Sequence, residues 1–209
     1  MDTLKIKVCG MRYPDNIRSV GALQPDYMGF IFYPPSKRYA DNLDHETLAQ
    51  LPETVRKTGV FVNASFNEIA EKVRDLGLHA VQLHGTEDAP FCGRVKASGI
   101  TVIKALGIDD NFDFDRLNDY AGNVDYFLFD TKTTLYGGSG KAFDWGLLHN
   151  YTLDKPYFLS GGLDEALLGS IYTLNDERLH AIDLNSRFET EPGLKDVERL
   201  KAVFEQIRK

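Results

Sequence analysis

The sequence has few cysteines and no long apolar runs. Only Cys9 and Cys92 occur among its 209 residues, without CxxC spacing, which excludes a disulfide-rich secreted scaffold. No stretch approaches the roughly 18 uncharged residues of a membrane helix, and no apolar signal core precedes the first strand pattern. We therefore expect a cytoplasmic protein that makes no membrane contact, in which Cys92 is a buried packing residue.

Several ligand-binding motifs are also missing. The five histidines lack metal-ligand spacing such as HxxxH, so no metal site is expected. Gly138-Ser139-Gly140 lacks the third glycine of a dinucleotide fingerprint, and Gly140-Lys141 is followed by Ala142, so the Walker A motif fails as well. The net charge of −7 argues against a general nucleic-acid-binding or anionic-membrane-binding surface.

Short runs rich in Val, Ile, Phe and Leu recur along the chain and alternate with helical patterns, which is typical of βα units in a parallel sheet. Eight such units fit an open doubly wound sheet or a closed barrel, and the missing nucleotide fingerprints favour the barrel. The predicted fold is α/β, a single (β/α)8 TIM barrel, compact with short loops, as one domain over residues 1–209. The expected strands are Leu4–Val8, Tyr27–Phe32, Lys57–Val62, Ala80–His84, Thr101–Leu106, Tyr126–Asp130, Tyr157–Leu159 and Ala181–Leu184.

Two helices have clear sequence signals. Ser65 and Glu68 form a capping box ahead of an apolar stripe, which predicts a helix reaching Leu76. Apolar residues repeat every three or four positions from Leu194 to Ile207, which predicts a final helix that covers the eighth strand. A further helix within Asp88–Ala97 has the weakest signal.

Alternation along the first strand places Cys9 on its polar side. Successive strand side chains point to opposite faces, so Cys9 shares a face with Lys5 and Lys7, opposite Ile6 and Val8. The rim at the carboxyl ends of barrel strands carries the chemistry, so this thiol is a candidate proton carrier. Two ammonium groups on its face would favour the thiolate. The alternative interpretation of a lone cysteine is a small buried hydrophobic residue.

The same alternation predicts polar side chains at the ends of other strands. Gln82 and His84 share one face, and Asp130 and Asp183 each stand opposite apolar neighbours. Ionisable groups are costly to bury unless they are paired or hydrogen-bonded, so their repetition favours a functional site. A structural ion-pair network is the alternative interpretation.

The loops after the last two strands have the features of a phosphate site. Gly161 and Gly162 follow the seventh strand and precede a helix expected near Asp164, and Asn185 and Ser186 follow the eighth. Barrel enzymes often bind phosphate with these two loops, where backbone N–H groups at a helix N-terminus meet the oxyanion. After the sixth strand, the Gly-rich segment 131–141 is expected to form a mobile cover over the site, the alternative being a flexible linker.

Six segments together resemble the phosphoribosylanthranilate isomerase family, the barrel enzymes of tryptophan biosynthesis. They are Lys7-Val8-Cys9-Gly10, residues 29–39 with Ser36-Lys37-Arg38-Tyr39, Val81-Gln82-Leu83-His84-Gly85, Gly137-Gly138-Ser139-Gly140-Lys141-Ala142-Phe143-Asp144-Trp145, Ser160-Gly161-Gly162-Leu163, and residues 189–196 with Pro192-Gly193-Leu194-Lys195-Asp196.

This resemblance implies an Amadori rearrangement of N-(5-phosphoribosyl)anthranilate, which is redox-neutral and needs no cofactor. It implies that Asp130 is the general acid that opens the furanose ring and that Cys9 is the general base that takes the C2′ proton. Arg38 is assigned to the anthranilate carboxylate, because a guanidinium binds both carboxylate oxygens at once. His84 and Asp183 are the other expected substrate-binding residues, with Asp183 on the ribose hydroxyls.

These roles require opposite ionisation states at one pH. Ring opening needs a protonated carboxyl group, whereas proton abstraction needs a thiolate. We expect burial to raise the pKa of Asp130 and the Lys7 ammonium to lower the pKa of Cys9.

One position departs from the family pattern. The expected Ser-Ser-Gly-Val-Glu is Asn185-Ser186-Arg187-Phe188-Glu189 here, so Arg replaces a small Gly at the predicted phosphate site. We expect Arg187 to present its own N–H or to turn its side chain onto the phosphate.

Other functions fit part of the pattern. They are a neighbouring phosphate-binding barrel enzyme, such as indole-glycerol-phosphate synthase or a ketose-phosphate epimerase, and a non-catalytic sugar-phosphate-binding barrel. In each case the expected partner is a small phosphorylated molecule, and the protein is expected to be a monomer or homodimer.

Overall fold

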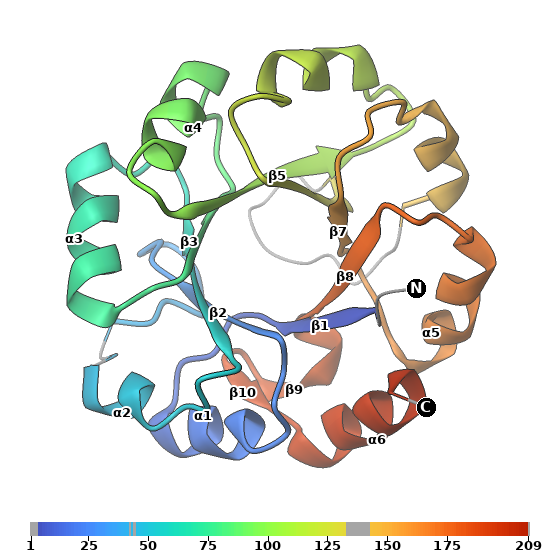
Figure 1. The fold of residues 1–209 in the computed structure, drawn as a ribbon. Coiled ribbons are helices and arrows are strands. Elements are labelled where there is room, and N and C mark those ends of the chain that lie inside the picture. Colours follow the sequence, from blue (N-terminus) through green and yellow to red (C-terminus); the bar gives the residue numbers. More distant parts are fainter. Residues whose placement is uncertain (1–3, 42, 44, 133–142, 209) are drawn as a thin grey trace.

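The computed structural model describes residues 4–41, 43, 45–132 and 143–208. Eight parallel strands, β1 to β8, form a closed barrel in chain order, and helices surround it (Figure 1). This confirms the predicted barrel, and every strand lies within two residues of its expected bounds. The strands are β1 Lys5–Val8, β2 Tyr27–Ile31, β3 Arg56–Phe61, β4 Ala80–Leu83, β5 Thr101–Ile108, β6 Tyr126–Thr131, β7 Tyr157–Leu159 and β8 Leu179–Leu184.

Strand alternation separates two cores, as the sequence predicts. On β8, Ala181 belongs to a small cluster inside the barrel, whereas Ile182 belongs to the large cluster between the strands and the helices. Leu128 and Phe129 divide in the same way on β6. The inner cluster fills one part of the barrel with apolar side chains. Positions of the same parity nearer the carboxyl ends are therefore left for polar groups.

The helices lie in the connections between strands, and the predicted capping box is confirmed. Ser65 caps α3 in a capping box with Glu68, and Gly77 ends this helix in the left-handed conformation. The connections after β5 and β6 contain 3-10 helices, η1 and η2, where the barrel pattern predicts α-helices. Asp113 and Asp144 cap these short turns by accepting from N–H groups two residues on. The helices are α1 Pro14–Gly21, α2 His45–Ala49, α3 Phe66–Leu76, α4 Ala89–Lys96, η1 Phe114–Tyr120, η2 Trp145–Asn150, α5 Glu165–Ile171, η3 Tyr172–Leu174, η4 Ser186–Phe188 and α6 Val197–Ile207.

The start of the final helix differs from the prediction. Leu194 lies in a short antiparallel hairpin of β9 Glu189–Glu191 and β10 Leu194–Lys195, outside the barrel sheet. Gly193 has a φ of +91° in the turn between them, a conformation that favours glycine. Asp196 then caps α6 by accepting from the Arg199 N–H at 3.1 Å. The apolar stripe continues through the hairpin, so its spacing could not mark where the helix begins.

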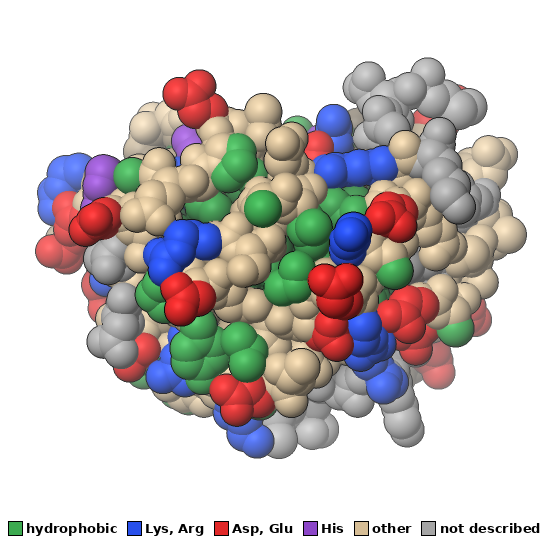
Figure 2. Space-filling view, turned by 90° about the horizontal axis from the view of Figure 1, so that it is seen from below, with side chains coloured by type: hydrophobic (Ala, Val, Ile, Leu, Met, Phe, Trp, Pro, Cys, Tyr) green, Lys and Arg blue, Asp and Glu red, His purple; other side chains and the backbone are tan. Residues whose placement is uncertain are grey.

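The outer surface carries charges of both signs. Figure 2 shows the side of the barrel with α1 and α6, where acidic and basic side chains are interspersed with small apolar patches. Across the described residues, no helix is both long enough and apolar enough to cross a membrane. The expected cover over the site lies outside the described residues, except for Thr131 and Lys132.

Candidate active site

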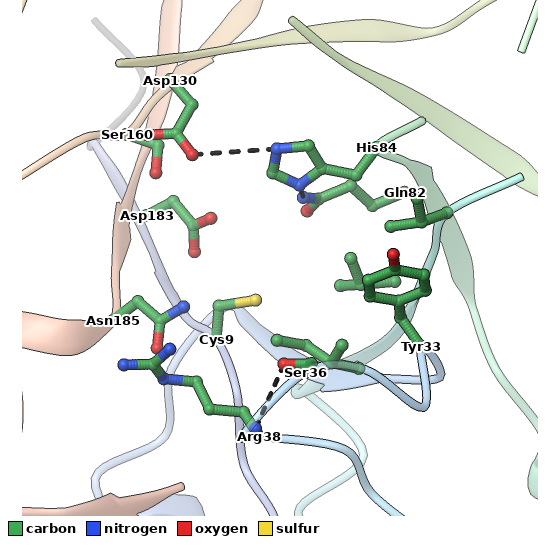
Figure 3. A pocket seen from close by; sticks show the side chains of 13 residues that line it. Cys9, Tyr33, Ser36, Arg38, Gln82, His84, Asp130, Ser160, Asp183 and Asn185 are labelled. Atoms are coloured by element: carbon green, nitrogen blue, oxygen red, sulfur yellow. Dashed lines mark hydrogen bonds and ion pairs between the residues drawn. The ribbon is translucent and has the colours of Figure 1, made fainter. Parts of the chain in front are cut away.

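One cavity opens among the carboxyl-terminal ends of the strands (Figure 3). Its volume is about 600 Å³ when the open mouth is included. The structure brings together in its lining the residues that the sequence assigned to catalysis and substrate binding, which are Cys9, Arg38, His84, Asp130 and Asp183.

Cys9 directly follows β1, and its sulfur points into the cavity (Figure 3). The residue is 3% exposed, and its N–H donates to the Leu184 carbonyl at 2.9 Å. Gly29 on the neighbouring β2 leaves room for the thiol, because a Cβ there would lie 2.7 Å from Sγ. The thiol is therefore buried, as the alternative interpretation of the sequence held, and it also faces a cavity.

The charges near Cys9 differ from those expected. Lys7 is fully buried, and its Nζ donates to Asp183 Oδ2 at 2.8 Å, so a carboxylate offsets its charge. Lys5 instead pairs with Asp26 at 3.3 Å. Burial raises the pKa of Cys9 above its ordinary value, and the opposing effect of Lys7 is smaller. The expectation of a lowered pKa is therefore wrong for this structure, in which the resting state of Cys9 is the thiol.

Asp130 lies at the end of β6, across the cavity from Cys9 in Figure 3. Its Oδ1 accepts from the Thr131 N–H at 2.8 Å. Burial raises the pKa of Asp130 to about 6, although the Thr131 hydrogen bond and Lys7 oppose the shift. The expected direction is confirmed. A carboxyl with this pKa exchanges a proton close to neutral pH, as a general acid must.

His84 follows β4, with its Nε2 3.8 Å from Asp130 Oδ2 (Figure 3). Burial and the nearby lysines, Lys7 and Lys104, lower the pKa of His84 to about 4. The imidazole is therefore neutral at pH 7, and its contact with Asp130 is polar rather than an ion pair. His84 Nδ1 lies 3.0 Å from Gln82 Nε2, which fixes the plane of the ring.

A buried ion pair holds the loop that follows His84. Lys104 Nζ donates to Glu87 Oε2 at 2.7 Å and to the Gly85 carbonyl at 2.8 Å. Glu87 in turn accepts from the Gly85 and Asn63 N–H groups at 2.9 and 2.8 Å. This structural ion pair therefore supports the loop that carries His84 into the cavity lining.

Comparison with known proteins identifies the family. The family model described as N-(5'phosphoribosyl)anthranilate (PRA) isomerase matches residues 6–206. The chain belongs to this isomerase family. Two relatives are named N-(5'-phosphoribosyl)anthranilate isomerase. The protein of Parabacteroides distasonis is 46% identical, and the match covers 97% of this chain and 92% of the relative. The protein of Phocaeicola vulgatus is 44% identical, and the match covers 97% of each chain. The crystal structure of the phosphoribosyl anthranilate isomerase from Thermotoga maritima superimposes on this chain with a TM-score of 0.83. The superposition covers 98% of each of the two chains, which are 34% identical in sequence.

The comparisons confirm the resemblance and favour the isomerase of tryptophan biosynthesis over the other barrel functions. A second isomerase structure, with a TM-score of 0.80, 30% identity and 98% coverage of each chain, is in complex with reduced 1-(o-carboxyphenylamino)-1-deoxyribulose 5-phosphate.

A second hollow adjoins the cavity, in the region where this isomerase is expected to bind phosphate. It is lined by Gly161, Gly162, Asn185, Ser186 and Arg187, together with Asp130 and Asp183. Gly161 has a φ of +90°, and a Cβ there would lie 2.4 Å from Thr131 Oγ1 and 2.7 Å from Thr131 N. Only glycine fits this position, so the β7 loop passes directly beside the β6 loop.

The helix expected to complete the phosphate site contributes less than predicted. Asp164 Oδ1 accepts from the Ala166 and Leu167 N–H groups, both at 3.1 Å, so the first turn of α5 is already capped by a carboxylate. Arg187 is exposed on η4 at the edge of the hollow. Candidate phosphate donors are therefore the glycine loop and the β8 loop.

Sequence reasoning did not assign every residue that lines this cavity. Ser160, Tyr33 and Ser36 were given no role, and Gln82 was placed only on the face of His84, yet all four line the cavity (Figure 3). Within the described part of the chain, Gln82 Oε1 and Asp183 Oδ1 are buried acceptor atoms without a hydrogen-bond partner. Such atoms are costly to leave unpaired, so they favour a ligand that brings donors. The face that Gln82 shares with His84 was the sequence signal that placed Gln82 near the site.

Proposed function

We propose that the cavity carries out the Amadori rearrangement of N-(5'-phosphoribosyl)anthranilate with Cys9 as general base and Asp130 as general acid. One observation carries the proposal: a thiol from β1 and a carboxyl from β6 with a pKa of about 6 line the same cavity. Acid and base on different strands allow a sugar to lie between them.

The proposed steps balance without a co-reactant. Asp130 gives its proton to the furanose ring oxygen as the C1′–O bond breaks and the nitrogen lone pair forms a C1′=N bond. The Cys9 thiolate then takes the C2′ proton, and that electron pair forms the enolamine. Movement of the 2′-hydroxyl proton to solvent and protonation at C1′ give the aminoketose.

Each group of the substrate is assigned to the side chains in the cavity that can bind it. The Arg38 guanidinium faces the anthranilate carboxylate, and Asp183 accepts from ribose hydroxyls. His84, as a neutral donor, contacts the sugar close to Asp130. The phosphate lies in the hollow between the β7 and β8 loops, where Gly161, Gly162, Asn185, Ser186 and Arg187 supply donors. Substrate hydroxyls would also satisfy Gln82 Oε1 and Asp183 Oδ1.

The family also bears on the oligomeric state that we propose for this protein. A Thermotoga maritima structure contains mutually generated monomers of a dimeric phosphoribosylanthranilate isomerase. For this chain we propose a single catalytic domain over residues 1–209 that acts as a monomer or homodimer in the cytoplasm.

The pKa values predict an unusual pH profile. In the active form Cys9 is a thiolate and Asp130 a carboxylic acid, whereas in the resting form Cys9 is a thiol and Asp130 a carboxylate. Both forms carry one proton in total, so the fraction of the active form does not change with pH between the two pKa values. Below the Asp130 pKa of about 6 both groups are protonated. We therefore expect kcat/KM to rise from pH 5 to 7 with a midpoint near pH 6, and to fall only above the raised pKa of Cys9.

This profile is measured by the loss of substrate fluorescence from pH 5 to 9. The substrate phosphate also titrates near pH 6, at about the same position. Comparison with Asp130→Asn separates the two, because in the variant the residual activity follows the Cys9 thiolate and keeps rising above pH 7, so any break that remains near pH 6 is due to the phosphate. Activity that falls between pH 5 and 7 in the wild type would contradict the proposed resting state.

Arg38→Met tests substrate recognition. Methionine keeps the aliphatic length but removes the charged donors, so KM should rise by about tenfold to a hundredfold, the scale of one charge-assisted contact, with a smaller change in kcat. Activity is compared on the natural substrate and on the aniline analogue, which lacks the ring carboxylate. The loss should be confined to the carboxylated substrate.

Arg74→Met is the matched control, because Arg74 lies on α3 with its side chain 73% exposed. Equal losses on the two substrates in Arg38→Met would argue against a carboxylate role for Arg38.

A further inference from the structure

A buried cluster of charges lies between the β9–β10 hairpin and the cavity. Arg38 Nε donates to Glu189 Oε1 and Oε2 at 2.9 and 3.0 Å, and its NH2 group donates to Oε2 at 2.7 Å. Lys195 Nζ donates to Glu189 Oε1 at 2.5 Å. The side chains of Arg38, Glu189 and Lys195 are 13%, 4% and 0% exposed. We propose that Glu189, held by Lys195, is a positioning residue that orients Arg38 toward the substrate carboxylate.

The proposal rests on the proposed role of Arg38, and the guanidinium geometry supports it. Glu189 occupies the edge formed by Nε and NH2. A guanidinium has N–H groups on both edges, and the edge formed by the two terminal nitrogens can bind a second carboxylate through both oxygens. Arg38 lines the cavity beside Asn185 in Figure 3. Glu189 therefore fixes the plane of the guanidinium and leaves the other edge for a ligand.

Glu189 is itself held in place from several directions. Its Oε1 also accepts from the Gly193 N–H at 3.1 Å, within its own hairpin. Lys195 Nζ donates to Asn185 Oδ1 at 2.8 Å, which connects the cluster to the loop after β8. The backbone of Lys195 is fixed by Asn16 of α1, whose side chain accepts from Lys195 N at 2.8 Å and donates to Lys195 O at 2.9 Å. A guanidinium bound to this carboxylate has little freedom to rotate.

The charge balance also suits an anionic ligand. Burial would raise the pKa of Glu189, but the hydrogen bonds from Arg38 and the charge of Lys195 outweigh it and hold the pKa below its usual value. One carboxylate thus stands between two cations, and with Lys195 protonated the cluster has a net charge of +1. A substrate carboxylate neutralises this charge, whereas an uncharged aromatic ring leaves it uncompensated.

The test is the ratio of kcat/KM for the natural substrate to kcat/KM for the aniline analogue. Glu189→Gln keeps the side-chain shape but directs an amide N–H group at Arg38 or Lys195, so it releases the guanidinium. We expect this ratio to fall about tenfold, mainly through KM for the carboxylated substrate. Glu191→Gln is the matched control, because Glu191 ends the same strand of the hairpin and is exposed. It should keep the wild-type ratio.

The outcomes separate this inference from the role of Arg38 itself. If Arg38→Met leaves the ratio unchanged, the assignment of Arg38 to the carboxylate fails. If Arg38→Met lowers the ratio and Glu189→Gln does not, the positioning role of Glu189 is overturned. Equal losses on both substrates in Glu189→Gln would show a structural role only and would also overturn it. If Glu189→Gln does not fold, Glu189→Asp carries the same test, because it keeps the charge and shortens the reach to Arg38.

Discussion

Cys9→Ala should lower kcat by about a hundredfold or more with little change in KM, the scale expected when a general base is lost. Alanine removes only Sγ, and the position is buried between Leu184 and Gly29, so the barrel should fold as before. The loss arises because no thiolate remains to take the C2′ proton. The measurement is steady-state turnover of freshly prepared substrate followed by its fluorescence, with circular dichroism to verify the fold.

Cys92→Ala is the control for the removal of a thiol. Cys92 lies on α4 and is fully buried within the large apolar core, away from the cavity lining. Its replacement should cost about 1 kcal/mol of stability and leave kcat unchanged. Wild-type kcat in Cys9→Ala would remove Cys9 from the mechanism, and another group would have to act as the base.

Most of the barrel and much of the site could be predicted because strand alternation is a local property. A period of two residues assigns Cys9, Asp130 and Asp183 to the inside, and the order of the strands assigns them to one rim. The structure places all three in the lining of one cavity. The same rule identified Gln82 on the face of His84, although it gave no reason to expect an unpaired acceptor there.

Features that depend on contacts between distant segments could not be predicted. The hairpin of β9 and β10 has an apolar spacing that continues the stripe of the final helix, so the helix was expected to begin too early. The partners of Arg38 were hidden for the same reason, because Glu189 lies 151 positions away in the sequence and reaches it only through this hairpin.

The direction of the pKa shift of Cys9 also depended on a contact that the sequence did not reveal. Sequence alternation placed Lys7 beside the thiol correctly, but the sequence did not show that Asp183 binds the same ammonium at 2.8 Å. Once that charge is offset, burial decides the direction of the pKa shift. A charge inferred from sequence predicts a pKa shift only when its own partner is also known.

Asp130→Asn should lower kcat/KM by about a hundredfold or more, because an amide cannot deliver a proton to the ring oxygen. Asparagine is close to aspartate in size, and its Oδ1 can still accept from the Thr131 N–H, which lies 2.8 Å away in the wild type. The loop after β6 should therefore keep its position. Turnover is measured with the fluorescence assay, and thermal unfolding verifies that the variant is folded.

Asp109→Asn is the matched control at the same rim. Asp109 directly follows β5, and its carboxylate accepts from Lys132 Nζ at 2.6 Å without lining the cavity. This variant should retain wild-type activity, whereas equal losses in the two variants would indicate a disturbed loop rather than a lost acid. Because Asp130→Asn removes a group that titrates near pH 6, it should also abolish the break in the profile at that pH, so that the residual kcat/KM keeps rising up to the raised pKa of Cys9. In Cys9→Ala the residual activity should instead fall as the pH rises through about 6, because only the protonated form of Asp130 is then needed, so the two variants distinguish the acid from the base.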